Sequence, residues 1–222
     1  MTAVLFDCDG VLIDSENLSV TELGHTLRRA GANISDADIF QRMIGRPIAE
    51  ILSMVLEEQG CDASSFLPEY GERLRARFEA DLQPMRGMRQ VIDAVPVGSR
   101  AVASSSTLPR LEHSLQLTEL WDLFAPHVYS ATQVARGKPA PDLFLFVANQ
   151  LGVAPADCIV IEDSPTGIQA ARAAGMRVIA FLGGSHAGAA RLAERVAPLM
   201  PDAIIADAAD LPEALRRMTE AA

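Results

Sequence analysis

Short apolar runs recur along this chain between longer helical patterns, and this alternation constrains the fold more than any other feature. Such runs, when turn residues bound them, are typical of strands buried on both faces of a sheet. The clear runs cover residues 3–6, 101–103, 159–161 and 178–181, and two weaker ones cover 127–129 and 203–205. Helical patterns lie between them at residues 86–95, 108–117, 141–151, 164–174 and 187–197. The alternation predicts an α/β fold in which βαβ units form a doubly wound parallel sheet.

Residues 15–83 interrupt this rhythm. They show helical periodicity and no convincing strand, with helical patterns at residues 18–30, 36–43, 48–59 and 68–81. The economical interpretation is an all-helical domain inserted after the first strand. We therefore predict a core domain formed by residues 1–14 and 84–222, and a helical domain formed by residues 15–83.

Composition excludes two classes of partner. A net charge of −10 argues against nucleic acid, and no apolar run reaches the roughly 18 residues that span a bilayer. The cysteines, Cys8, Cys61 and Cys158, are odd in number and scattered, and no signal peptide precedes the first strand. We therefore expect a cytoplasmic protein with reduced thiols, either a monomer or a weak homo-oligomer.

Polar side chains follow three of the predicted strands where each strand ends. Ligands of doubly wound sheets bind beyond the carboxyl ends of the strands, so these side chains should converge on one crevice. They are Asp7 and Asp9 after the first strand, Ser104, Ser105 and Ser106 after the second, and Glu162 and Asp163 after a later one.

Asp7 and Asp9 suit a nucleophile and a proton shuttle. The first carboxylate can attack phosphorus and form an acyl phosphate, while the second protonates the leaving oxygen and then deprotonates water. Gly10 allows the turn that faces both into one cavity. An isolated Asp-x-Asp-Gly is about as often a plain turn after a strand.

Crowded carboxylates beside a phosphate predict a bound cation. A hard ion such as Mg²⁺ would offset their repulsion, with Asp7, Asp9 and Asp163 as ligands and Glu162 as a further candidate. Because the protein as a whole is acidic, local cations must attract an anionic substrate.

The segment from Ser104 to Thr107 ends a strand and opens a helix. Its hydroxyl and backbone N–H groups, chiefly those of Ser104 and Ser105, predict a phosphate-binding site at the positive end of the helix. The alternative for Ser106 or Thr107 is a plain helix N-cap.

Lys138 is the single lysine of the chain, whose other basic residues are arginines. Lysine places a compact charge on a flexible stem, whereas arginine is a wide planar fork. A site that needs one small cation between a carboxylate and a phosphoryl oxygen selects lysine. Pro139 follows it and restricts the backbone before it, which fixes the direction of the side chain.

Taken together, Asp7-x-Asp9-Gly10, Ser104, Lys138 and Glu162-Asp163 resemble the four motifs of the haloacid dehalogenase superfamily, in order and at family spacing. The resemblance covers essentially the whole chain and is closest to the branch of β-phosphoglucomutases and small sugar-phosphate phosphatases. It implies a Rossmann-like core with a helical cap. It also implies Asp7 as nucleophile and metal ligand, and Asp9 as acid/base with its backbone carbonyl on Mg²⁺. Ser104 and Lys138 would hold the phosphoryl group, and Asp163 would bind the metal.

Single residues discriminate among branches of this superfamily. Haloacid dehalogenases lack the second aspartate, so Asp9 disfavours carbon–halogen cleavage, and phosphonatases use a cap lysine that residues 15–83 do not contain. β-Phosphoglucomutases typically carry a histidine ten residues beyond the second aspartate. Here that position is Ser19, and the nearest histidine is His25. We therefore expect a Mg²⁺-dependent phosphatase acting on a sugar or polyol phosphate, with a phosphosugar mutase as the alternative. A non-catalytic phosphometabolite-binding protein is the alternative from another class, although no motif is damaged.

Specificity should come from the helical domain. Arg46, in Gly45-Arg46-Pro47, is a candidate substrate contact, although a solvated arginine is an equally good interpretation. For Arg73 and Arg77 we expect salt bridges to Glu69, Glu72 or Glu79 rather than ligand contact.

Overall fold

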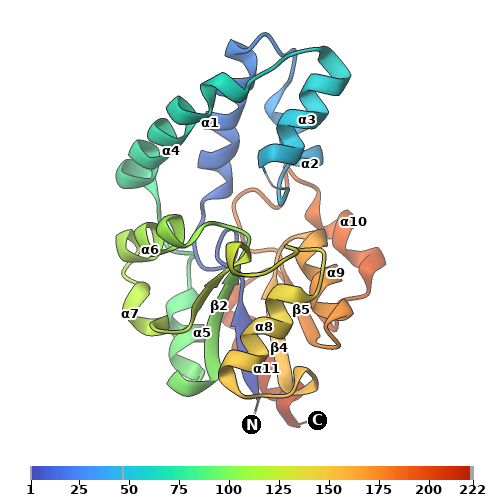
Figure 1. The fold of residues 1–222 in the computed structure, drawn as a ribbon. Helices are drawn as coiled ribbons and strands as arrows, with labels where there is room; N and C mark the ends of the chain where they lie inside the picture. Colours follow the sequence, from blue (N-terminus) through green and yellow to red (C-terminus); the bar gives the residue numbers. More distant parts are fainter. Residues whose placement is uncertain (1, 47, 221–222) are drawn as a thin grey trace.

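The computed structural model describes residues 2–46 and 48–220, and within these ranges the chain forms one parallel sheet (Figure 1). Its order is β3-β2-β1-β4-β5-β6, and every neighbouring pair is parallel. The strands are β1 (Ala3–Phe6), β2 (Arg100–Ser104), β3 (Val128–Ser130), β4 (Cys158–Glu162), β5 (Arg177–Phe181) and β6 (Ala203–Ile205). The predicted doubly wound α/β fold is confirmed, and both weaker runs are strands.

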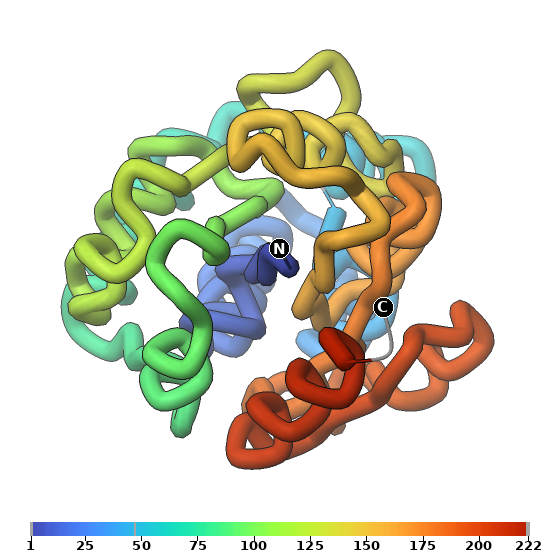
Figure 2. Tube along the Cα trace, turned by 90° about the horizontal axis from the view of Figure 1, so that it is seen from below, coloured from blue at the N-terminus to red at the C-terminus, as the bar shows by residue number. Residues whose placement is uncertain are grey.

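Helices cover both faces of this sheet because alternate strand residues point to opposite sides. Val4 and Phe6 of β1 pack on the side of α5 and α11, whereas Leu5 packs on the side of α8 and α9. Viewed along the strands, β1 lies between these two layers (Figure 2). The core helices are α5 (Met88–Ala94), α6 (Leu108–Leu117), α7 (Trp121–Phe124), α8 (Asp142–Leu151), α9 (Pro165–Ala173), α10 (Leu192–Val196) and α11 (Leu211–Glu220).

The inserted segment lies beyond one end of the sheet and contains helices but no strand among its described residues (Figure 1). These helices are α1 (Glu16–Arg29), α2 (Asp36–Arg42), α3 (Ile48–Gln59) and α4 (Leu67–Asp81). We call residues 15–83 the cap segment. Its helices pack around apolar side chains of their own, among them Leu27, Ile39 and Val55. That this segment is a separate domain stays a prediction.

The chain passes between the core and the cap segment twice, and the two crossings lie side by side. The N–H of Asp14 donates to the carbonyl of Gln83 over 3.0 Å, and the N–H of Met85 donates to the carbonyl of Leu12 over 2.8 Å. Ile13 and Pro84 form an antiparallel bridge between them. The crossings therefore fall close to the predicted limits at residues 15 and 83.

One predicted helix is wrong over half its length. The pattern at residues 187–197 predicts a continuous helix, but α10 starts only at Leu192 and turns precede it. Arg191 has a φ of 49°, in the left-handed region, which a continuous right-handed helix does not accommodate. The alanine-rich composition of this segment favours a helix, but residues 187–191 form turns instead.

Candidate active site

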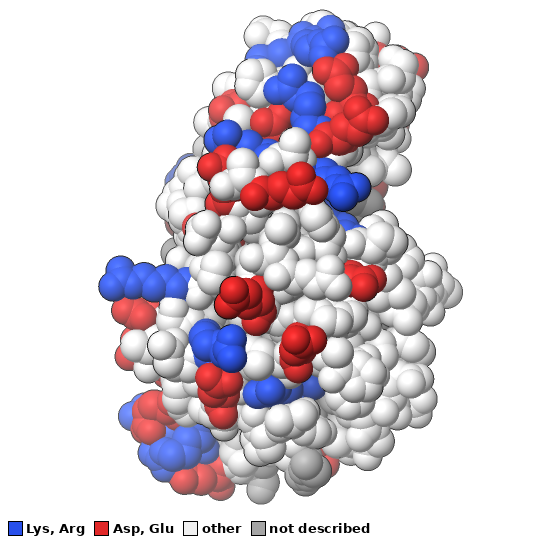
Figure 3. Space-filling view, turned by 90° about the vertical axis from the view of Figure 1, so that its left-hand side faces the viewer, with Lys and Arg blue, Asp and Glu red and all other residues white. Residues whose placement is uncertain are grey.

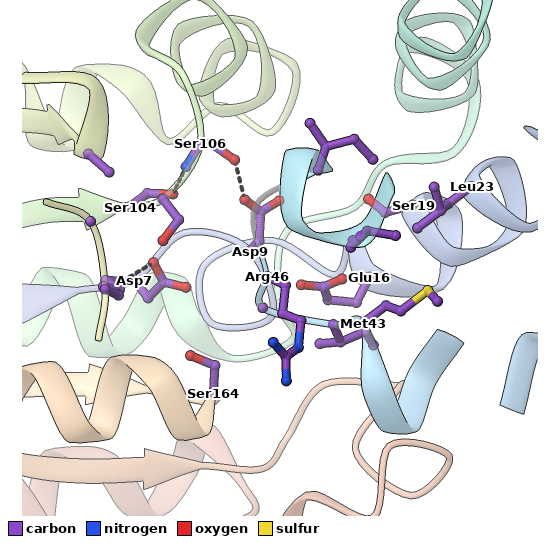
Figure 4. A pocket seen from close by; sticks show the side chains of 18 of the residues that line it. Asp7, Asp9, Glu16, Ser19, Leu23, Met43, Arg46, Ser104, Ser106 and Ser164 are labelled. Atoms are coloured by element: carbon purple, nitrogen blue, oxygen red, sulfur yellow. Dashed lines mark hydrogen bonds and ion pairs between the residues drawn. The ribbon is translucent and has the colours of Figure 1, made fainter. Parts of the chain in front are cut away.

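The candidate site lies at the carboxyl ends of β1, β2 and β4. β2 and β3 lie on one side of β1, and β4, β5 and β6 lie on the other, so the strand order reverses at β1. Ligands of such sheets bind at this reversal. Asp7 follows β1, Ser104 ends β2 and Glu162 ends β4. A cavity of about 340 Å³ lies between these side chains and the cap segment (Figure 4).

Lys138 connects three strand ends. Its ammonium group donates to Oδ1 of Asp7 over 2.8 Å, to Oε1 of Glu162 over 2.6 Å and to the carbonyl of Ala103 over 2.9 Å. Its side chain is only 3% exposed. Burial alone would lower the pKa of Lys138, but the two carboxylates outweigh burial and raise it. Lys138 is therefore a permanently charged group inside the cavity wall.

The carboxylates of Asp7, Glu162 and Asp163 form a buried cluster, with one oxygen from each within 4.8 Å of the others. Burial raises the pKa of Asp7, and Glu162 and Asp163 raise it further against the opposing effect of Lys138. Burial and Glu162 likewise raise the pKa of Asp163. One lysine therefore does not compensate these charges. An all-oxygen donor set with uncompensated negative charge fits a divalent cation such as Mg²⁺.

Both oxygens of Glu162 already have donors. Oε1 accepts from Lys138, and Oε2 accepts from the backbone N–H and the hydroxyl of Ser164, each over 2.9 Å. Gly167 makes room for this arrangement, because a Cβ there would lie 1.7 Å from Oε1. The position of Glu162 therefore suits holding Lys138 more than binding a metal directly.

Asp9 lies in a separate set of contacts. Its Oδ1 accepts from the hydroxyl of Ser15 over 2.6 Å and from the guanidinium of Arg110 over 3.0 Å, and its Oδ2 accepts from Ser106 over 2.7 Å. Burial would raise the pKa of Asp9, but Arg110 and the two hydroxyls outweigh burial and lower it. In this arrangement Asp9 is an ionised carboxylate.

The three serines after β2 have different environments. The hydroxyl oxygen of Ser104 is buried and accepts from the backbone N–H of Ser106 over 3.1 Å, so its proton is free to donate. Ser105 is exposed at the cavity. Ser106 contacts Asp9, and the N-cap Thr107 makes no side-chain capping bond, so neither is the plain side-chain cap considered from sequence.

Asp163 packs closely against the turn that follows Asp9. Gly10 has a φ of 78°, and a Cβ on it would lie 2.0 Å from Oδ2 of Asp163. Glycine is therefore required here both for the backbone conformation and for the space. The other neighbour of this oxygen is His186, whose Nε2 lies 3.0 Å from it.

The cap segment contributes a second wall to the cavity. Arg46 lies on it, and Oε2 of Glu50 is 3.6 Å from its guanidinium. Glu16 and Ser19, from the first turn of α1, lie on the same wall (Figure 4). Burial, together with the charges of Asp9 and Asp163, raises the pKa of Glu16 to about 8.

Arg73 and Arg77 form salt bridges as expected, but with other partners than those predicted. Arg73 contacts Glu22 over 2.8 Å, and Arg77 contacts Asp81 over 2.9 Å. Residue 22 is on α1, and sequence separation gave no sign of this contact. Neither arginine lines the cavity. On the face shown in Figure 3, basic and acidic side chains are mixed over the cap segment without a broad surface of one sign.

Arg110, Glu16 and His186 are among the site residues that the sequence analysis did not identify. Arg110 also approaches Ser19 over 3.4 Å and lies over the ring of Phe78, so it connects Asp9 to the cap segment. Signals existed for two of them. A cation in the first turn of a helix, as at Arg110 in α6, opposes the helix dipole. His186 follows two adjacent glycines after a strand.

Among the described residues, no helix is both long enough and apolar enough to cross a membrane.

Known proteins resemble this chain over most of its length. The family model described as haloacid dehalogenase-like hydrolase matches residues 4–181. The phosphorylated carbohydrates phosphatase of Thermotoga maritima is 30% identical over 211 residues, which cover 92% of this chain and 97% of that protein. The 6-phosphogluconate phosphatase of Escherichia coli is 27% identical, with 83% and 84% covered.

Two further comparisons bear on the mutase alternative and on the fold. The β-phosphoglucomutase of Bacillus subtilis is 31% identical, with 79% of this chain and 81% of that protein covered. The crystal structure of a conserved haloacid dehalogenase-like protein of unknown function from Agrobacterium tumefaciens superposes with a TM-score of 0.86. It is 36% identical and covers 98% of this chain and 99% of its own.

Proposed function

Because this chain belongs to the haloacid dehalogenase-like hydrolase family, we propose that it is a Mg²⁺-dependent phosphatase of a small phosphorylated metabolite, a sugar or polyol phosphate. The observation that carries the proposal is the contact of Lys138 with Asp7 inside a cavity at the strand ends. A carboxylate held beside a fixed cation has both a nucleophilic oxygen and a partner for the phosphoryl group. The phosphatases of T. maritima and E. coli support the substrate class.

We assign Asp7 as the nucleophile. Its Oδ1 is engaged by Lys138, which leaves Oδ2 to attack phosphorus. A bond from Asp7 to phosphorus forms while the bond from phosphorus to the leaving oxygen breaks, which gives an aspartyl phosphate and an alcohol. Water then attacks the aspartyl phosphate and releases inorganic phosphate and free Asp7.

We assign Asp9 as the group that moves the protons. It would donate one to the leaving alcohol in the first half of the reaction and take one from water in the second. Its contacts with Ser15, Ser106 and Arg110 suit the second half, because they keep the carboxylate ionised. Before the first half, Asp9 must gain a proton and release at least one of these donors.

Ser104, Ser105 and Lys138 would bind the phosphoryl oxygens. The free proton of the Ser104 hydroxyl and the exposed position of Ser105 support this role. Fixed donors at these positions stabilise the charge that develops on the transferring group, and each such donor typically contributes about 3–4 kcal/mol.

Asp7, Asp163 and the backbone carbonyl of Asp9 would hold Mg²⁺, and Glu162 would orient Lys138. When bound, the cation neutralises the carboxylates and polarises the phosphoryl group. We further propose that residues 15–83 act as a cap domain whose Arg46 contacts the substrate. A cytoplasmic location accords with free Cys8, Cys61 and Cys158.

Release of inorganic phosphate from p-nitrophenyl phosphate and from a panel of sugar and polyol phosphates tests the proposal. We expect release that needs Mg²⁺, stops with EDTA and disappears in Asp7→Asn. Full activity in EDTA would remove the metal from the mechanism. A folded wild-type protein that binds these esters but releases no phosphate would instead be a binding protein.

A phosphosugar mutase remains the second candidate because of the B. subtilis relative. Ser19 lies on the cavity wall where the mutase pattern has a histidine, and His25 is exposed elsewhere on α1. We therefore expect β-glucose 1-phosphate to give phosphate faster than glucose 6-phosphate. Isomerisation that outruns phosphate release would favour the mutase.

A further inference from the structure

The two walls of the cavity differ in chemistry, and only the core wall is rich in charge. The core wall carries the carboxylates, Lys138 and the serines that would hold the phosphate. The cap wall carries seven aliphatic or thioether side chains and few polar ones. The apolar side chains are Val20, Leu23, Ile39, Met43, Ile44, Ile48 and Ile51. Once the phosphate is fixed on the core side, the alcohol part of the substrate faces this cap wall.

The apolar side chains are not loose surface groups. Ile39 is fully buried and Met43 is 2% exposed, and both belong to the apolar core of the cap segment. Leu23, which comes from α1 (Figure 4), and the partly buried Ile48 also line the cavity. A hydroxyl placed against such side chains loses its hydrogen bonds to water and gains none. That loss costs about 1–3 kcal/mol for each unpaired group.

Among the described residues, the polar side chains of the cap wall are Glu16, Ser19, Arg46 and Tyr70. Glu16 and Ser19 are one turn apart on α1, and Ser19 approaches Arg110, which contacts Asp9. The carboxyl group of Glu16 and the hydroxyl of Ser19 can both form hydrogen bonds with a hydroxyl of the substrate. These groups can serve a hydroxyl close to the ester oxygen but not a whole hydroxylated chain.

We infer that the preferred substrate is a phosphate monoester whose alcohol has a hydroxyl beside the ester and an apolar segment beyond it. This inference rests on the proposed phosphatase activity and narrows its substrate class. A fully hydroxylated chain would place several hydroxyls against the aliphatic side chains. The segment that fits is partly deoxygenated, with Glu16 and Ser19 on its polar end and Leu23, Met43 and Ile48 along its apolar end.

Two esters of equal carbon number test the inference in the wild-type protein with Mg²⁺. They are 1,2-hexanediol 1-phosphate, with one hydroxyl beside the ester, and a hexitol 1-phosphate, in which each carbon other than the esterified one carries a hydroxyl. We expect kcat/KM to favour the diol ester by about 10–100-fold, since apolar pockets discriminate against added hydroxyls by such factors. Acetyl phosphate, which does not reach the cap wall, reports phosphatase activity independently.

Met43→Gln tests the residues directly, because glutamine has a similar shape and brings an amide to the wall. We expect the preference for the diol ester to fall roughly tenfold. Leu56→Gln is the matched control, since Leu56 is 48% exposed on α3 and lies off the cavity. That control should keep the wild-type preference. If Met43→Gln does not fold, Ile48→Thr, at a partly buried position on the same wall, replaces it.

The outcomes separate the inference from the proposed function. Hydrolysis of acetyl phosphate combined with equal or faster turnover of the hexitol ester would overturn the inference and leave the phosphatase standing. An unchanged preference for the diol ester in folded Met43→Gln, or in the Ile48→Thr protein that replaces it, would have the same meaning. No hydrolysis of acetyl phosphate or of either ester would overturn both.

Discussion

Nε2 of His186 lies 3.0 Å from Oδ2 of Asp163, and the histidine is completely buried. Apart from this approach, neither ring nitrogen has a hydrogen-bond partner among the described residues. Burial lowers the pKa of His186, which favours the neutral imidazole, and the ring packs against the carboxylate of Asp163 without a hydrogen bond to it. His186 therefore restricts the orientation of a carboxylate that we assign to the metal.

His186→Phe should weaken Mg²⁺ binding, because phenylalanine keeps the ring and removes the nitrogen beside Asp163. Partners that orient metal ligands are typically worth about 10–100-fold in affinity, and we expect a loss in this range. The rise in Tm with Mg²⁺ concentration, fitted to its logarithmic dependence on [Mg²⁺]/Kd, measures the affinity without turnover. The exposed His25→Phe is the control and should bind Mg²⁺ like the wild type. Equal affinities in both variants would contradict the role of His186.

Lys138→Arg should lower kcat by roughly 10²–10³-fold although it preserves the charge. The guanidinium is too wide to reach Asp7, Glu162 and the carbonyl of Ala103 together, and a displaced electrostatic contact costs about 3–4 kcal/mol in the transition state. Arg136→Lys, two positions earlier on an exposed side chain, should leave kcat unchanged and change stability by no more than about 0.5 kcal/mol. Steady-state phosphate release compares the two variants. A fully active Lys138→Arg enzyme would show that the site accepts a guanidinium group.

Asp9→Asn should slow hydrolysis of alkyl phosphates by about 10²–10⁴-fold, the usual contribution of general acid–base catalysis. Aryl esters such as p-nitrophenyl phosphate should lose less, because p-nitrophenolate leaves without needing a proton. The measurement is the ratio of the two losses in kcat/KM, which reports the first half of the reaction and not the hydrolysis of the shared aspartyl phosphate. Equal losses for both classes of ester would mean that Asp9 does not protonate the leaving group.

Glu16→Gln should stabilise the protein increasingly as pH rises. The pKa of Glu16 is about 8 in the folded protein against 4.5 ordinarily, so its contribution to stability is fully present below pH 4.5. It is lost as pH rises through 8, since the unfolded chain releases the proton first. Tm values in EDTA should therefore diverge between pH 5 and pH 8.5, with the variant the more stable protein at the higher pH. Glu57→Gln, on the exposed side of α3, should show no such divergence.

The sheet was predictable because buried parallel strands leave apolar runs, and even the weak run at residues 203–205 became β6. The positions of Lys138 and Asp7 in the site could be expected from the sequence. Lys138 is the single lysine of the chain, and Asp7 directly follows the apolar run that forms β1. Arg110 left only a weak signal, its unfavourable place in the first turn of α6, and Glu16 left none, because the partners of both come from other elements. An acidic residue in the first turn, such as Glu16, is also what ordinary helix electrostatics favours, so nothing set it apart.

The paired crossings at Ile13 and Pro84 limit how the cap segment can move. Two segments of one chain that are joined by backbone hydrogen bonds form a two-stranded ribbon. Such a ribbon bends out of its plane more easily than its segments slide along each other. If the cap segment opens for substrate, the motion is therefore close to a rotation about one axis. Glu16 and Ser19, just beyond the ribbon, would travel least, and the apolar side chains of α2 and α3 would travel furthest. During closure, the hydroxyl beside the ester would then meet its protein contacts first, and the far end of the alcohol would meet the apolar side chains last.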